Sequence, residues 1–141
     1  MSLSAQKAYR NAEVETISQR DLLVRLYQGA ERFLTIAQEA MRSRKIEEAH
    51  NNCQKAKAIF QELLSTLNFE VGGDTAIQLR DLYAFFISQI VQANLAKQPT
   101  MLAELMPIIA KLRTAWEQIP AEHANLSSVS SSQGHSLFVR T

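Results

Sequence analysis

Apolar residues recur at alternating intervals of three and four positions in four separate segments of the chain. Residues spaced in this way lie on one face of an α-helix, and the alternation is typical of helices that pack along a shared seam. The pattern predicts helices at about 18–42, 44–69, 74–97 and 100–119. The seam of the first segment consists of Leu23, Leu26, Ala30, Phe33, Ala37 and Ala40. The pattern is most regular in the second segment, whose seam consists of Ile46, Ala49, Cys53, Ala56, Phe60, Leu63 and Leu67. The chain is therefore expected to be all-α.

Residues suited to helix ends lie between these segments. Ser18 precedes the first segment, where its side chain can accept a hydrogen bond from an unpaired amide of the first turn. Gly72 and Gly73 precede the third segment, and glycine readily takes the positive φ that ends a helix. We expect the chain to reverse at these glycines and Asp74 or Thr75 to cap the helix that follows.

Short connections also set the arrangement of the helices. Pro99 separates the third and fourth segments, and Pro107 is expected to bend the fourth helix, because proline lacks a backbone donor. Long helices joined by short connections become antiparallel neighbours, so the predicted fold is an antiparallel up-down four-helix bundle over residues 18–119. We expect residues 1–17 to form an N-terminal arm or short helix and the serine-rich residues 120–141 to form a flexible tail.

Composition argues against several classes of function. The chain has 15 basic and 14 acidic residues, and the resulting net charge of +1 argues against binding to nucleic acid. Charges interrupt every apolar segment before it reaches the length of a membrane-spanning helix, so no stable membrane insertion is expected. The single cysteine, Cys53, cannot form an internal disulfide, and the first residues lack the apolar run of a signal peptide. These features favour the cytoplasm.

The sequence contains no pattern typical of an active site. Glu47 and His50 form one Glu-x-x-His pair, whereas a metal site inside a bundle needs such pairs on two helices and carboxylates on the other two. Cys53 lies on a seam among aliphatic residues, which is usual for an inert buried thiol. We therefore expect no metal, no cofactor and no enzymatic activity.

The third helix is expected to be apolar on two sides. Opposite its seam, a second row of apolar residues consists of Ile77, Ala84, Ile87, Val91 and Leu95. Burying a large apolar side chain stabilises a protein by about 1.5–3 kcal/mol, and a row left in water loses this stabilisation for each such side chain. One interpretation is a groove for an amphipathic helix of a partner, with Ile59 as a wall. The other is that the rest of the fold, the N-terminal segment or another copy of the chain covers the row.

Three strings of residues occur in an order and at spacings found in a known family. They are LYxGA at 26–30, GGxxAxxLxxLY at 72–83 and RxAW at 113–116. With them the chain resembles the flagellin-specific export chaperones, the FliS family. The resemblance implies an antiparallel helical bundle in the cytoplasm that binds the disordered C-terminal segment of flagellin. It also implies that the chaperone prevents premature polymerisation of flagellin and assists its delivery to the flagellar export gate.

The apolar row and the resemblance together indicate a set of partner-binding residues. Asn94 is expected to hydrogen-bond the client. Tyr9, which matches the family's N-terminal tyrosine, is expected to occupy part of the groove until the client arrives. The predicted site consists of Tyr9, Ile59, Ile77, Ala84, Ile87, Val91, Asn94 and Leu95. The alternative prediction is a self-associating helical bundle, or an adaptor that binds another amphipathic helix.

Overall fold

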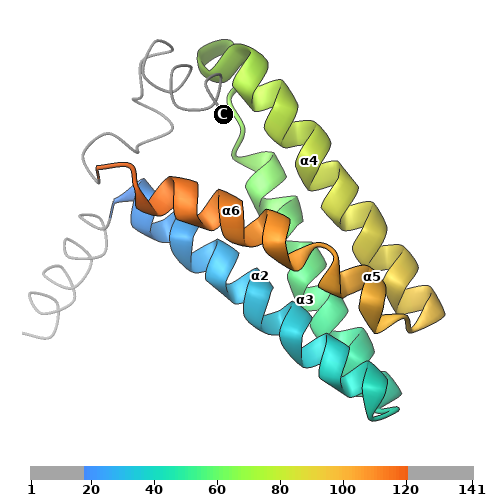
Figure 1. The fold of residues 1–141 in the computed structure, drawn as a ribbon. Coiled ribbons are helices and arrows are strands. Elements are labelled where there is room, and N and C mark those ends of the chain that lie inside the picture. The colour runs from blue at the N-terminus through green and yellow to red at the C-terminus, as the bar shows by residue number, and fades with distance from the viewer. Residues whose placement is uncertain (1–17, 121–141) are drawn as a thin grey trace, which may run out of the picture.

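The computed structural model describes residues 18–120 of the 141-residue chain. The predicted N-terminal arm and almost all of the serine-rich tail lie outside these residues. The part of the chain that the structure describes is an all-α antiparallel bundle, as predicted (Figure 1). Its helices are α2 (Gln19–Arg42), α3 (Ile46–Ser65), α4 (Phe69–Ala96), α5 (Pro99–Ala103) and α6 (Met106–Glu117). The short α5 and the longer α6 together form the fourth arm of the bundle.

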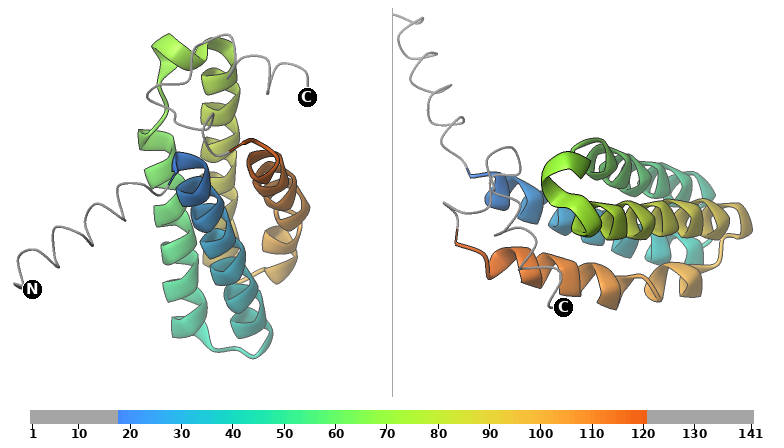
Figure 2. Two further views of the ribbon diagram at one scale, coloured as in Figure 1. Left: turned by 90° about the vertical axis from the view of Figure 1, so that its left-hand side faces the viewer. Right: turned by 90° about the horizontal axis from the view of Figure 1, so that it is seen from above.

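The helix α2 occupies the centre of the arrangement. It packs against α3, α5 and α6, whereas α4 packs against α3 and α5 (Figure 2). Because α2 has these neighbours, a wide arc of its surface is buried, and Tyr27 and Leu34 within this arc are fully buried. Leu26 and Phe33, which belong to the predicted seam, are only partly buried. The predicted seam of this helix is therefore displaced by one residue in its middle.

The first helix begins where the sequence predicts. The Ser18 hydroxyl accepts a hydrogen bond from the Asp21 amide at 3.1 Å and so caps α2. The second helix is shorter than predicted and begins at Ile46, because Ser43 caps the end of α2 and Arg44 takes the left-handed conformation, with φ of 59°. The reversal between α2 and α3 therefore uses residues 43–45.

The third helix begins earlier than predicted. The Asn68 side chain caps it by accepting hydrogen bonds from the Glu70 and Val71 amides, both at 3.1 Å. Gly73 does take a positive φ, 53°, but it forms a kink inside α4 instead of the reversal between α3 and α4. The prediction that Asp74 or Thr75 caps this helix is therefore wrong.

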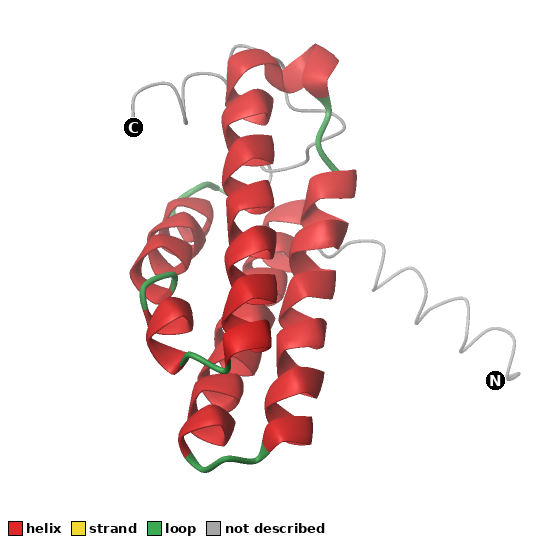
Figure 3. Cartoon of the chain, turned by 90° about the vertical axis from the view of Figure 1, so that its right-hand side faces the viewer, coloured by secondary structure: helices red, strands yellow, loops and turns green. Residues whose placement is uncertain are grey.

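The fourth segment is broken at Glu104 and Leu105 instead of bent at Pro107 (Figure 3). Pro107 lies in the first turn of α6, where a missing backbone donor costs no hydrogen bond. The break lets α6 change direction and run along α2 (Figure 1).

The core combines aromatic rings with one polar contact. Phe60 of α3 packs against Phe86 and Tyr83 of α4, with ring centroids 4.9 Å and 6.2 Å apart. The hydroxyls of Tyr27 and Tyr83 lie 2.5 Å apart and share a hydrogen bond in the buried interior. Because each hydroxyl is the other's partner, the core buries two polar groups without leaving either unpaired.

Candidate functional site

The two-sided character predicted for the third helix is present in α4. Ala76, Leu79, Tyr83, Phe86, Ile90 and Ala93 are buried in the core. On the opposite side Ile77, Val91 and Leu95 are 40%, 38% and 82% exposed, and Ala84 between them is also exposed. We call Ile77, Ala84, Val91 and Leu95 the α4 stripe.

The packing of the bundle explains why this stripe is open. The break before α6 directs that helix along α2, so α4 packs mainly against α3 and α5 and touches α2 through Tyr83 (Figure 2). These contacts lie on the core side of α4, where the buried seam residues are. The stripe therefore remains in solvent over most of the helix length, a surface that apolar side chains rarely line without a partner.

Two further residues of the predicted site lie on α4 but differ from the stripe. Ile87 is partly buried and packs against the core. Asn94 is also partly buried, and its amide nitrogen lies 3.0 Å from His50 Nδ1 of α3. The Lys97 ammonium donates to the Asn94 side-chain oxygen at 2.6 Å and to its backbone oxygen at 2.7 Å. A client that used this amide would have to replace contacts that Asn94 already makes.

The remaining two predicted residues do not join the stripe. Ile59 of α3 faces α2, where its Cδ1 lies 3.2 Å from the position that a Cβ would take at Gly29. It therefore stabilises the close approach of α2 and α3 and does not form a wall beside α4. Tyr9 lies outside the described residues.

One exposed aromatic residue on α4 is missing from the predicted site. Phe85 is 45% exposed, and its ring centroid lies 6.1 Å from that of Phe86. Consecutive helical residues point about 100° apart, so Phe85 flanks the stripe while Phe86 enters the core. Two adjacent phenylalanines cannot both lie on one seam of a helix. The sequence alone could therefore have predicted that one of these two rings lies outside the core.

A second apolar surface lies between the start of α2 and the end of α3. It is a groove of about 390 Å³ lined by Gln19, Leu22, Leu23, Arg25, Leu26, Glu62 and Thr66. Leu22 is 46% exposed there. Periodicity did not predict this groove, because Leu23 and Leu26 belong to the predicted seam and Leu22 was assigned no role.

The described residues offer little chemistry beyond packing and hydrogen bonding. They contain no group of three histidine, cysteine, aspartate or glutamate side chains able to hold a metal ion. Burial raises the pKa of the Cys53 thiol, which disfavours the reactive thiolate. None of the described helices combines the length and the apolar character needed to cross a membrane.

Hydrogen bonds and ion pairs connect the helices around the core. Arg113 of α6 donates from Nε to Glu31 of α2 at 2.6 Å and from Nη1 to Glu117 at 2.5 Å. The hydrogen bond with Glu31 is the main reason that the pKa of Arg113 is raised. Trp116, next to Glu117 on the same helix, is buried and interacts with the Tyr27 hydroxyl. The LYxGA, GGxxAxxLxxLY and RxAW strings therefore meet in the interior of the bundle through Tyr27, Tyr83 and Trp116.

A family model described as "Flagellar protein FliS" matches residues 1–123. The chain belongs to the FliS family. It is 35% identical over 126 residues to the flagellar secretion chaperone FliS of Vibrio cholerae, a match covering 86% of this chain and 93% of that protein. It is 32% identical over 111 residues to FliS of Bacillus subtilis, with 79% of this chain and 82% of that protein covered. FliS of Campylobacter jejuni is 32% identical over 115 residues, which cover 82% and 90% of the two chains.

Membership in the FliS family confirms the predicted resemblance. FliS is a family of flagellar secretion chaperones and not of enzymes, which agrees with the prediction of a non-enzymatic binding protein. The three strings that suggested the family hold the bundle together through Tyr27, Tyr83, Arg113 and Trp116. The α4 stripe lies outside these contacts and is free to act as a surface.

Proposed function

We propose that this FliS-family protein is a cytoplasmic export chaperone that binds the disordered C-terminal segment of flagellin. In this role it prevents premature polymerisation of flagellin and assists its delivery to the flagellar export gate. The observation that supports a binding role most directly is the α4 stripe, because three of its large apolar side chains stay exposed along one side of a single helix. Family membership supports the flagellar context.

The stripe suits an amphipathic helix of the client. Ile77, Ala84, Val91 and Leu95 lie along one side of α4, so a client helix can follow them over several turns. Burial of each large side chain would stabilise the complex by about 1.5–3 kcal/mol before the cost of ordering the client is subtracted. A disordered segment that folds on this surface gains a structure in which it cannot pair with other flagellin molecules.

The other predicted site residues have lesser roles in this proposal. Phe85 and the exposed part of Ile87 extend the apolar surface on its two sides. Asn94 exchanges its contacts with His50 and Lys97 for contacts with the client. Tyr9 covers part of the surface in the free protein. Ile59 contributes indirectly, because it holds α3 against α2.

Calorimetric titration of the full chain with the C-terminal fragment of its cognate flagellin tests this proposal. We expect saturable one-to-one binding with a negative heat-capacity change, which is the signature of apolar burial. Val91→Asp should weaken binding by about tenfold or more, or about 1.4 kcal/mol, because it places a charge in the apolar interface. Circular dichroism of each variant verifies that the bundle remains folded.

Two matched variants locate the binding surface. Gln28→Asp introduces the same side chain at an exposed helical position of α2 and should leave the affinity unchanged. Leu22→Asp alters the α2–α3 groove instead of the stripe. A loss with Leu22→Asp but not with Val91→Asp would move the client to that groove. A folded protein that binds no flagellin fragment would remove the proposed client.

A further inference from the structure

The α2–α3 groove combines an apolar lining with exposure to solvent. Leu22, Leu23 and Leu26 of α2 provide the apolar part of the lining, and Leu22 is 46% exposed. The volume of about 390 Å³ falls in the range of roughly 300–1,000 Å³ in which proteins hold compact ligands. The groove therefore suits a short apolar segment with a few side chains better than a long helix.

The groove also has a negative side and a positive side. Glu62 lines it from α3 and Arg25 from α2, and both residues are exposed. Glu62 forms no ion pair with any other described residue. Opposite charges across a contact fix the orientation in which two surfaces meet. An apolar segment that carries a basic residue at one end is therefore complementary to the groove, with the basic residue toward α3.

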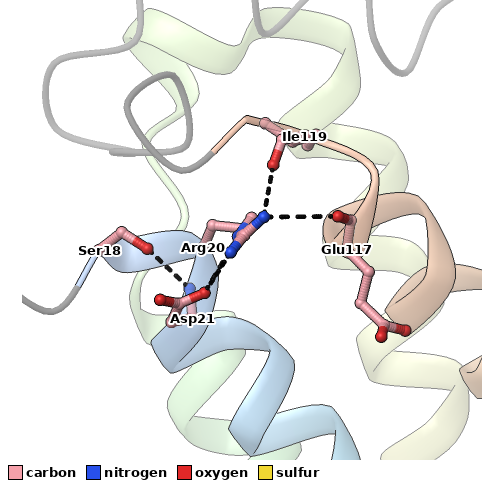
Figure 4. A network of polar contacts seen from close by, with 5 residues as sticks. All are labelled: Ser18, Arg20, Asp21, Glu117 and Ile119. Atoms are coloured by element: carbon pink, nitrogen blue, oxygen red, sulfur yellow. Dashed lines mark hydrogen bonds and ion pairs between the residues drawn. The ribbon is translucent and has the colours of Figure 1, made fainter.

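The chain leaves the described bundle close to this groove. Arg20 of α2 donates from Nη1 to the Ile119 carbonyl at 3.1 Å and so holds residues 119–120 against the start of α2 (Figure 4). Gln19, which precedes Arg20, lines the groove. A helix rises 1.5 Å per residue, so the groove extends only about 10 Å along α2 from Gln19 to Leu26. Whatever follows Pro120 in the chain therefore begins beside the groove.

The sequence after Pro120 contains a segment of the required chemistry. Leu137, Phe138 and Val139 are consecutive large apolar residues, and the basic Arg140 follows them directly. Residues 1–17, by contrast, contain no two adjacent large apolar residues. The family model matches residues 1–123, so this apolar triplet lies outside the part of the chain that the family shares.

The residues between Pro120 and the triplet have the length and composition of a linker. Residues 121–136 include six serines and one glycine, a composition typical of flexible chains. A flexible chain of this length spans about 20–24 Å on average, which is enough to return over the groove. Such a linker holds the triplet near the groove at an effective concentration on the order of millimolar. Even a contact of millimolar intrinsic affinity would then form in a large share of the molecules.

We propose that Leu137, Phe138 and Val139 dock in the α2–α3 groove of the same chain, with Arg140 beside Glu62. The docked segment covers Leu22 and closes the groove to other apolar segments. It leaves the α4 stripe open, so the docking does not depend on the proposed function and needs no client.

Intramolecular disulfide formation in the full chain, without flagellin, tests this docking. The buried Cys53 is first replaced by alanine so that the introduced cysteines are the only thiols. Thr66→Cys places a thiol in the groove lining, and Ser136→Cys places its partner directly before the triplet. Neither change removes an apolar side chain of the groove or of the triplet.

The matched control combines Thr66→Cys with Ser128→Cys. Ser128 lies nearer to Pro120 along the chain, so an undocked tail would cross-link through position 128 at least as fast as through position 136. With docking, the pair at 66 and 136 should form its disulfide about fivefold faster than the control pair, at a rate independent of protein concentration. Adding Phe138→Ser should slow it to the rate of the control.

Three outcomes of this experiment would overturn the proposal. The control pair would react as fast as the pair at 66 and 136 if the tail does not dock. A rate that Phe138→Ser leaves unchanged would show that the triplet is not the anchor. Disulfide-linked dimers in place of cross-linked monomers would assign the groove to the tail of a second copy.

Methyl NMR of the leucine-labelled chain provides a second measurement that needs no introduced cysteine. Phe138→Ser should shift the methyl signals of Leu22 and Leu26 and leave those of the fully buried Leu34 unchanged. Tyr9→Ser is the comparison for the other end of the chain. If Tyr9→Ser shifts the Leu22 signals and Phe138→Ser does not, residues 1–17 fill the groove and the proposal is wrong.

Discussion

The hydroxyl pair of Tyr27 and Tyr83 makes the stability of the bundle sensitive to alkaline pH. Burial raises the pKa of Tyr27 from 10.0 to about 12, an effect that hydrogen bonds from Tyr83 and Trp116 partly offset. Burial also raises the pKa of Tyr83 well above 10.0. A phenol whose pKa is raised by folding holds its proton more tightly in the folded chain than in the unfolded one. The stabilisation is therefore complete below pH 10 and is lost as the pH rises toward 12.

We predict that the free energy of unfolding falls steeply above about pH 10, by up to about 1.4 kcal/mol per pH unit for each buried tyrosine. Urea unfolding at several pH values measures this slope. Tyr27→Phe combined with Tyr83→Phe should flatten the profile, since it removes both titrating groups and leaves no hydroxyl unpaired. An equally steep profile in the double variant would assign the alkaline transition to other groups.

Gly73 is the residue whose backbone conformation most restricts substitution. Its φ of 53° and ψ of −127° lie in a region that side chains with a Cβ avoid, although open space surrounds the position of that Cβ. Gly73→Ala should therefore lower the free energy of unfolding by about 1–2 kcal/mol through backbone strain alone. Gln78→Ala, at an exposed position of the same helix, should change it by less than about 0.5 kcal/mol. Equal stability of the two variants would show that the kink relaxes.

At the scale of residues, the sequence predicts the role of a residue with a strong local conformational preference. It does not predict a role that depends on how the helices pack. Ser18 and Gly73 were recognised because a helix start needs a side-chain acceptor and a positive φ needs glycine. Thr75 has the same local signature as a cap, yet it is buried on α4. Asn68 takes that role, because the chain had already reversed before the glycines.

At the scale of elements, Arg20 fastens the end of α6 to the start of α2 (Figure 4). Its Nη1 donates to the Ile119 carbonyl at 3.1 Å and to the Glu117 carbonyl at 3.5 Å, and its Nε and Nη2 donate to Asp21. The last carbonyls of a helix have no partner within it, so this arginine satisfies groups that the helix itself leaves unpaired.

Replacing Arg20 with alanine should cost roughly 1 kcal/mol and expose the end of α6. Hydrogen exchange of the amides near residues 117–119 should accelerate, while exchange in α3 stays unchanged. Arg80→Ala is a matched control, because Arg80 contacts Asp81 through the same two nitrogens but is exposed on α4. If both variants lose equal stability, the contact between α2 and α6 contributes nothing.

The helices themselves were predictable, and their directions were less so. Four apolar seams identified every long helix, because each must bury one face in a common core. The split between α5 and α6 was predicted only as a bend, since Pro107 forbids an interior helical hydrogen bond but does not specify where the preceding helix ends.

At the scale of the whole molecule, the function depends on which faces the bundle leaves open. The stripe of Ile77, Ala84, Val91 and Leu95 was predictable because α4 has more apolar surface than one seam can bury. The position of Ile59 was not predictable from the sequence, because periodicity does not tell which neighbouring helix a residue beside the seam will contact. The α2–α3 groove was missed for the same reason, because it is made by two helices together.

The most direct test of the binding surface is methyl NMR of the chain labelled at isoleucine, leucine and valine and titrated with the flagellin fragment. We predict large shifts for the methyl groups of Ile77, Val91 and Leu95, because a client helix would bury them. The methyl groups of Leu34 and Ile109, which are fully buried in the core, should shift little. Shifts confined to Leu22 and Leu26 would contradict the assignment of the client to α4 and place it in the α2–α3 groove.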